Sequence, residues 1–134
     1  MNSLRHRASV FSVRVCGAAA LAVLAVHVRA EVVEIKWSRD GRSEQRLSVA
    51  PGGFVELCGR LNRGVNVEWQ WTSTVPVDFN VHFHEGKDVE YPTRLEQRRA
   101  AVGVLTAPKE QDYCWMWRNA SLEPAAVSAR LLSR

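Results

Sequence analysis

The chain has 134 residues, of which 46% are hydrophobic and 24% are charged, and its formal net charge is +4. This length fits one folded domain and no more. Four of the 18 basic residues precede Glu31, which leaves 14 basic residues to balance the 14 acidic ones that follow. The positive charge therefore belongs to the start of the chain, and it does not favour a nucleic-acid partner or an anionic membrane.

Residues 1–30 are typical of a signal peptide. A basic start precedes an apolar run over 18–28, and Val28-Arg29-Ala30 fits a signal-peptidase site before Glu31. The run is short for a membrane span, and an uncleaved anchor is the alternative. We expect an exported protein, periplasmic or extracellular (in the secretory lumen of a eukaryote), with residues 31–134 as its domain. It would contact the membrane only through the signal peptide before cleavage.

Short segments that alternate apolar and polar residues, separated by polar, glycine-rich or proline-rich turns, predict β-strands along the rest of the chain. Before the central stretch these segments are residues 31–38, 44–50 and 54–58. After it they are residues 89–91, 100–106 and 111–118. Residues 93–99 fit a loop or a helical turn, and residues 122–132 fit a closing strand or a short helix.

The strongest pattern lies in residues 65–85, where both halves alternate. The apolar face consists of Val65, Val67, Trp69 and Trp71 in the first half and Val77, Phe79, Val81 and Phe83 in the second. Residues 72–76 between them predict a turn, and Pro76 suits a strand start because it has no N–H to donate. A lone hairpin is marginal in water and requires a second apolar layer. We therefore predict an all-β fold, an antiparallel β-sandwich of about eight strands.

Two cysteines, Cys58 and Cys114, remain after the leader. An even number of cysteines in an exported chain suggests a disulfide, and two free buried thiols are the alternative. On the chain-entropy interpretation, closing so long a loop would stabilise the fold by roughly 4 kcal/mol.

The polar face of the second half of the central stretch carries a row of candidate ligands. Its members are Asp78, Asn80, His82 and His84. Two imidazoles two residues apart could bind one zinc or copper ion, with a carboxylate from Asp78 or Glu85 as a third ligand. The alternative is a solvated polar face without a cofactor, which is the outcome we expect.

Aromatic side chains suggest a second candidate site. Tyr113, Trp115 and Trp117 share one face of their strand, and Cys114 and Met116 share the other. If the second face is buried, the aromatic face is exposed and could bind a peptide or a sugar. This candidate surface comprises Trp69, Trp71, Tyr113, Trp115 and Trp117. In the alternative the aromatic residues are core, and Cys114 then needs a partner on the outer face. Asn119-Ala120-Ser121 is, in addition, a formal glycosylation sequon.

The order of several short motifs resembles the GOLD (Golgi dynamics) domain over about residues 54–121. These motifs are Cys58, Phe79-Asn80-Val81-His82-Phe83, Gly86-Lys87, Val89-Glu90-Tyr91, and Tyr113 to Trp117 with Asn119. The resemblance implies a jelly-roll-like sandwich and, as in the family's cargo receptors, a disulfide between two strands. Cys58 matches the first position of that disulfide, whereas Met116 occupies the second and Cys114 lies two residues earlier. The receptors' coiled coil, membrane span and sorting tail have no counterpart after this region.

No catalytic set is present in the sequence, which lacks a Ser/His/Asp order, a nucleophile elbow and a glycine-rich phosphate loop. We therefore predict a protein that is not an enzyme, with no catalytic residues. The expected function is an exported, GOLD-like binding module for an unknown protein, peptide, glycan or lipid ligand. The alternative is an exported metal-binding protein that uses His82 and His84.

Overall fold

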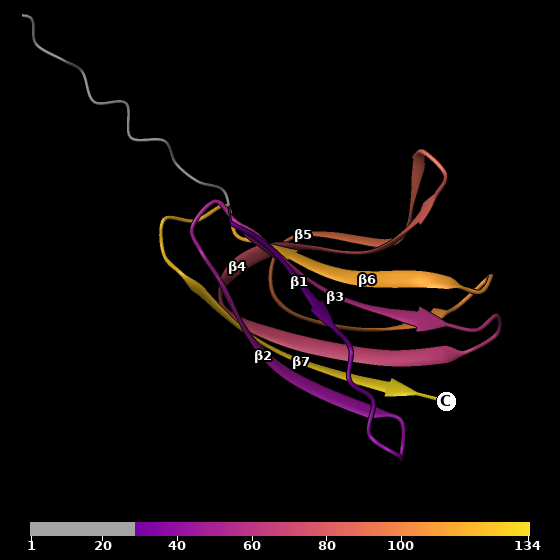
Figure 1. Ribbon diagram of the computed structural model, residues 1–134. Coiled ribbons are helices and arrows are strands. Elements are labelled where there is room, and N and C mark those ends of the chain that lie inside the picture. Colours follow the sequence, from indigo (N-terminus) through magenta and orange to yellow (C-terminus); the bar gives the residue numbers. More distant parts are fainter. Residues whose placement is uncertain (1–28) are drawn as a thin grey trace, which may run out of the picture.

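The computed structural model describes residues 29–134, which fold into seven strands without a helix (Figure 1). The strands are β1 (Ala30–Glu34), β2 (Arg42–Val49), β3 (Phe54–Leu61), β4 (Asn66–Glu85), β5 (Asp88–Thr106), β6 (Gln111–Arg118) and β7 (Ala125–Ser133). The all-β, sandwich-like fold class is thus confirmed. Within the described residues, no helix could cross a membrane. The predicted signal peptide lies almost entirely outside the described part of the chain.

Two long strands, β4 and β5, organise the whole sheet. They contain 20 and 19 residues and pair with each other along their length. The first half of β4 also pairs with β7, and its second half pairs with β6. One part of the molecule therefore has the strand order β5-β4-β7-β2, and the other has the order β5-β4-β6-β3-β1. Figure 1 shows the resulting curled sheet.

The predicted hairpin over residues 65–85 is wrong, because this stretch is a single strand. Residues 72–76 contain a register irregularity instead of a turn. Apolar alternation continues through them, since Val75 and Val77 are both buried on the side of Trp71. Pro76 lies where β4 has left β7 and has not yet reached β6, so no ladder hydrogen bond needs its missing N–H.

Two further details differ from the sequence prediction, and one alternative that it left open is decided. Residues 88–106 form one bulged strand, not two strands joined by a loop or a helical turn, and Gln97 adopts a positive φ of 50° within it. The ambiguous C-terminal segment is a strand, β7. The strand count is thus seven, and the β1–β3 pair is parallel while the other pairs are antiparallel.

The core lies between the two parts of the curled sheet and is rich in aromatic rings. The Phe79 ring centroid lies 5.0 Å from that of Trp69, 5.1 Å from that of Trp71 and 5.4 Å from that of Trp117. Gly103 of β5 stands opposite Trp69 in the β4–β5 register, and a Cβ at this position would overlap the indole of Trp69. Close approach of that ring therefore requires glycine here.

Candidate functional site

The predicted polar row on β4 faces away from the core, but one of its members is buried. His82 is only 4% exposed, and its Nδ1 lies 2.8 Å from Oδ1 of Asn80. Its Nε2 lies 3.8 Å from the carboxylate of Glu56 on β3. The rings of His84 and Tyr91 cover it from β4 and β5, at centroid distances of 5.4 and 5.8 Å. The expectation of a solvated face therefore does not hold at His82.

Asp78 is directed away from the histidines. Its carboxylate accepts hydrogen bonds from the backbone N–H of Gln97 at 3.1 Å and from the Gln97 side-chain amide at 2.8 Å. Arg118 lies 3.8 Å away on the other side. These contacts hold Gln97 in its positive-φ conformation. Within residues 29–134, the two histidines do not gather a third ligand at metal-binding distance. A zinc or copper site on His82 and His84 remains an untested alternative.

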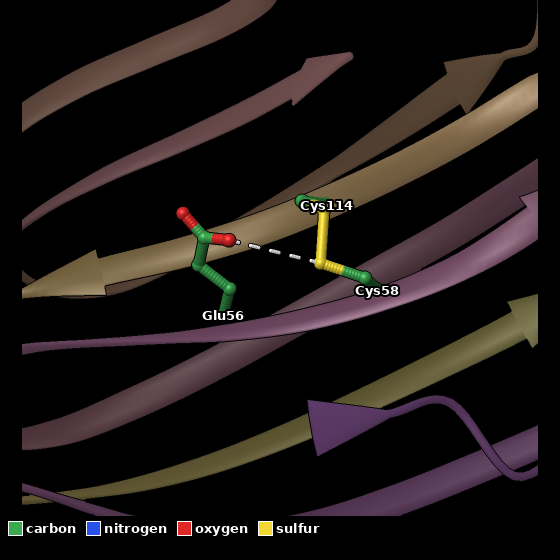
Figure 2. A group of neighbouring side chains, drawn as sticks. All are labelled: Glu56, Cys58 and Cys114. Atoms are coloured by element: carbon green, nitrogen blue, oxygen red, sulfur yellow. Dashed lines mark hydrogen bonds between the residues drawn. A yellow bond between two sulfur atoms is a disulfide. The ribbon is translucent and has the colours of Figure 1, made fainter. Parts of the chain in front are cut away.

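The predicted disulfide is present and joins β3 to β6. Cys58 and Cys114 are directly opposite in the register, with Cα atoms 4.1 Å apart and an S–S distance of 2.09 Å. Figure 2 shows Glu56 beside the bridge, with its carboxylate 3.9 Å from Sγ of Cys58. The three side chains are close enough to resemble a metal site. Because both sulfurs are committed to the disulfide, neither is a thiolate that could bind a metal.

The disulfide settles which way β6 faces. Cys114 and Cys58 meet on the outer side, and the aromatic residues of β6 therefore face the core. All five aromatic side chains of the predicted binding surface are at most 5% exposed. They are Trp69, Trp71, Tyr113, Trp115 and Trp117. The candidate aromatic surface is therefore wrong and the core alternative holds, because these rings supply the apolar layer between the two parts of the sheet.

Burial also perturbs the acid–base chemistry of the row. Burial, followed by the neighbouring His84, lowers the pKa of His82. Because an amide oxygen only accepts, the short contact with Asn80 places a proton on Nδ1 of His82. Burial raises the pKa of Glu56, and His84 opposes that rise. Burial thus shifts the pKa of each group in the direction of its neutral form.

The lowered pKa of His82 predicts a loss of stability in mild acid. The pKa of a histidine in an unfolded chain is about 6.5, so below that pH the unfolded chain binds more protons than the folded one. The free energy of unfolding should therefore fall as the pH drops from 6.5 towards the lowered pKa of His82. Urea denaturation across this range measures the slope.

His82→Gln should flatten this slope, because glutamine does not titrate. Glu56→Gln removes the opposing contribution, since a raised carboxyl pKa favours the fold at low pH and loses that effect as the pH rises. His84→Gln then measures how much the neighbouring His84 ring contributes to the lowered pKa of His82, and so to the slope. An unchanged slope in His82→Gln would contradict the assignment.

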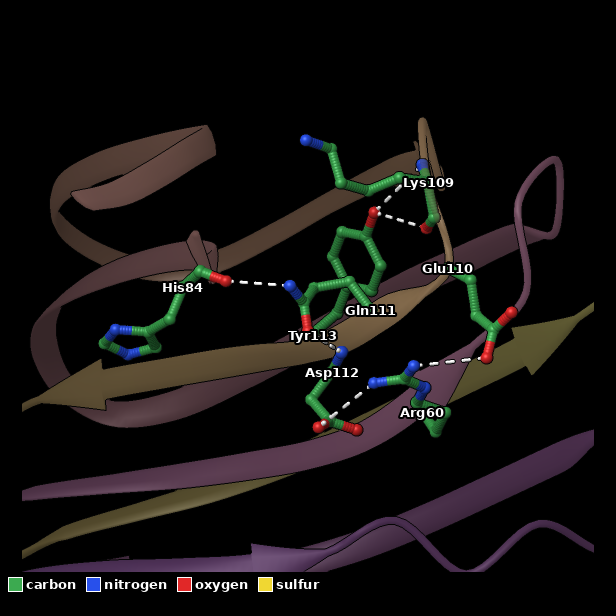
Figure 3. A network of polar contacts seen from close by, with 7 residues as sticks. All are labelled: Arg60, His84, Lys109, Glu110, Gln111, Asp112 and Tyr113. Carbon is green, nitrogen blue, oxygen red and sulfur yellow. Dashed lines mark hydrogen bonds and ion pairs between the residues drawn. The ribbon is translucent and has the colours of Figure 1, made fainter. Parts of the chain in front are cut away.

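A network of hydrogen bonds and ion pairs, which the sequence analysis did not predict, lies at the end of the sheet next to His84 (Figure 3). The side-chain amide of Gln111 donates to the carbonyl oxygen of His84 at 2.8 Å. The hydroxyl of buried Tyr113 donates to the carbonyl oxygen of Lys109 at 2.9 Å. Arg60 lies 3.1 Å from Glu110 and 3.6 Å from Asp112. These contacts fix the β5–β6 turn against β3 and β4.

A second feature missed from the sequence is an open surface over β5, β4 and β7. Two hollows of about 550 and 480 Å³ adjoin there, and Gln70, Val102 and Arg130 line both. Val102 and Val104 on β5 are 76% and 60% exposed. The sequence signal was present, because residues 100–106 contain no charge on either strand face.

Solved structures of known proteins share the fold of this chain, although sequence comparisons find no match. No family model and no curated protein matches the sequence. PliG from Aeromonas hydrophila, a periplasmic inhibitor of g-type lysozyme, superposes with a TM-score of 0.65 at 15% identity, covering 79% of this chain and 98% of that chain. PliG from Salmonella Typhimurium superposes with a TM-score of 0.54 at 10% identity, covering 78% of this chain and 99% of that chain. This chain shares their fold.

The same architecture also occurs outside these inhibitors. The pre-peptidase C-terminal domain of a Bacillus anthracis collagenase gives a TM-score of 0.53 at 9% identity, covering 80% of this chain and 96% of that chain. The solved structures that this chain resembles thus include PliG inhibitors and this domain, and the resemblance to the GOLD family is wrong. Its motifs are period-two strand patterns that unrelated sandwiches share, and Phe79–Phe83 lies within one 20-residue strand. The disulfide and the periplasmic neighbours agree with the predicted export.

Proposed function

We propose that this chain is an exported, non-catalytic protein that binds another protein and inhibits it, with a g-type lysozyme as the first candidate partner. The observation that supports this most is the extent of the likeness. The fold covers 98% of the Aeromonas inhibitor with a TM-score of 0.65, so the likeness extends over almost the whole of that protein.

The architecture suits a binding protein. The Cys58–Cys114 bridge and the aromatic core hold the sheet in one shape, and a preformed surface loses little entropy when it binds. Fold alone does not define a partner, because one fold supports many functions. The proposal therefore depends on a direct test of inhibition.

Purified exported protein should slow the lysis of bacterial cell walls by a g-type lysozyme in a saturable manner, approaching one inhibitor per enzyme. A c-type lysozyme is the matched control and should keep its activity. Isothermal titration calorimetry with both enzymes separates binding from inhibition. The proposal is overturned if a large excess of the protein neither slows the g-type enzyme nor binds it.

A further inference from the structure

Residues 100–106 of β5 form an open strand edge. Within the described chain, β5 pairs with β4 alone. The N–H of Ala107 donates to the carbonyl oxygen of Val65, and its own carbonyl oxygen accepts from Gly64, so the backbone of Ala107 points towards β4. Backbone direction alternates along a strand. The N–H and C=O groups of the even-numbered residues therefore point outward, and these residues are Ala100, Val102, Val104 and Thr106.

This edge lacks the protection that the other edges of the sheet carry. β1 includes two glutamates, and β2 includes Arg42, Glu44 and Arg46. Folded proteins place charges on edge strands to prevent pairing with another chain. Residues 100–106 contain none, and Val102 and Val104 are 76% and 60% exposed. The edge is therefore ready to accept another strand.

We propose that this edge pairs with the same edge of a second copy of the chain. The segment reads Ala-Ala-Val-Gly-Val-Leu-Thr, which is nearly symmetric about Gly103. A twofold axis at Gly103 places Val102 opposite Val104 of the other copy, and Ala100 opposite Thr106. Both pairs join even-numbered residues, whose free N–H and C=O groups face the partner. The symmetric arrangement thus satisfies the whole open edge.

The side chains are equally compatible with this register. The two valines of each copy come together on the outer face and lose their exposure to water, which favours association. Arg98 and Arg99 precede the segment, so the twofold axis sends the arginines of the two copies to opposite ends of the interface. The pairing extends the order β2-β7-β4-β5 across the axis into the second copy. No like charges stand opposite each other within the paired segment.

The first test measures the mass of the exported protein by light scattering over a range of concentrations. We expect twice the chain mass at high concentration and the single mass on dilution. Hydrogen exchange should show the amides of Val102 and Val104 slowing as the dimer forms. A protein that stays monomeric at about 100 μM, a concentration that detects even weak dimers, would overturn the proposal. Protection of these amides only by a different protein would also overturn it.

Charge variants test the register. Val102→Lys/Val104→Lys places lysines opposite lysines, and Val102→Glu/Val104→Glu places glutamates opposite glutamates. Each should raise the dimer dissociation constant by about 100-fold or more, because opposed like charges are strongly unfavourable. An equimolar mixture of the double lysine and double glutamate variants should restore a dimer with one copy of each variant, because lysines then stand opposite glutamates. Val32→Lys, at an exposed position on the β1 edge, is the control and should leave dimerisation unchanged. Dimerisation of either double variant alone would overturn this register.

Discussion

Replacing Cys58 and Cys114 together with alanine is expected to lower the free energy of unfolding by roughly 4 kcal/mol. The bridge joins residues 56 positions apart, and it restricts the unfolded chain over that whole loop. It also ties β3 to β6, the strand that places Tyr113, Trp115 and Trp117 in the aromatic core. Chemical denaturation of the oxidised wild type and the double variant measures the difference.

Reductant supplies the control for this prediction. Reduced wild type should be destabilised by about the same amount as the double variant, whereas the variant itself should not respond to reductant. Leu122→Ala, a change at a 95% exposed side chain in the loop after β6, should shift the unfolding free energy by less than about 0.5 kcal/mol. If the free energy of unfolding of the double variant lies within about 1 kcal/mol of that of the oxidised wild type, the bridge contributes little to stability.

Alternation predicted which side chains form the core, but not how long the strands are. Odd-numbered residues from Val67 to Phe83 face inward on β4, as the period-two pattern requires, and all are buried except the half-buried Ser73. The pattern has no break in parity at residues 72–76, so one bent strand fits it as well as two strands and a turn. Which answer holds depends on pairing with β6 and β7, and those strands lie far along the chain. Local sequence does not contain that information.

In the candidate site, too, some features could be predicted from local sequence and others depended on how the strands pair. The disulfide could be predicted because residues 31–134 contain only two cysteines. The burial of His82 could not, because Glu56 from β3 and Tyr91 from β5 surround it only after the sheet has formed. The direction of the β6 aromatic residues was left open, since it depends on where Cys58 meets Cys114. The unpaired edge of residues 100–106 likewise depends on sheet order.

Asn119 illustrates a residue whose sequence motif and structural role differ. It opens a glycosylation sequon, but its side chain is 0% exposed. Nδ2 donates to the carbonyl oxygens of Val49 at 3.1 Å and Glu123 at 2.7 Å. Oδ1 accepts from the N–H of Ser121 at 2.9 Å and from its hydroxyl at 2.7 Å. Both amide protons are therefore occupied, and a glycan on Nδ2 is incompatible with this fold.

Asn119→Ala is therefore expected to cost roughly 3 kcal/mol of unfolding free energy, because the buried carbonyl oxygen of Val49 and the part-buried N–H of Ser121 both lose their bond to the amide. Asn119→Asp should cost at least as much, since a carboxylate would face the two carbonyl oxygens that now accept from Nδ2. Ser121→Ala is the matched control within the same loop. It removes the hydroxyl and its contacts with the exposed Glu123 backbone, keeps the Ser121 N–H bond to Oδ1 of Asn119, and should cost only about 1 kcal/mol. Urea denaturation of the three variants checks this order. Equal effects of Asn119→Ala and Ser121→Ala would contradict a central role for the asparagine amide in joining the end of β2 to the β6–β7 loop.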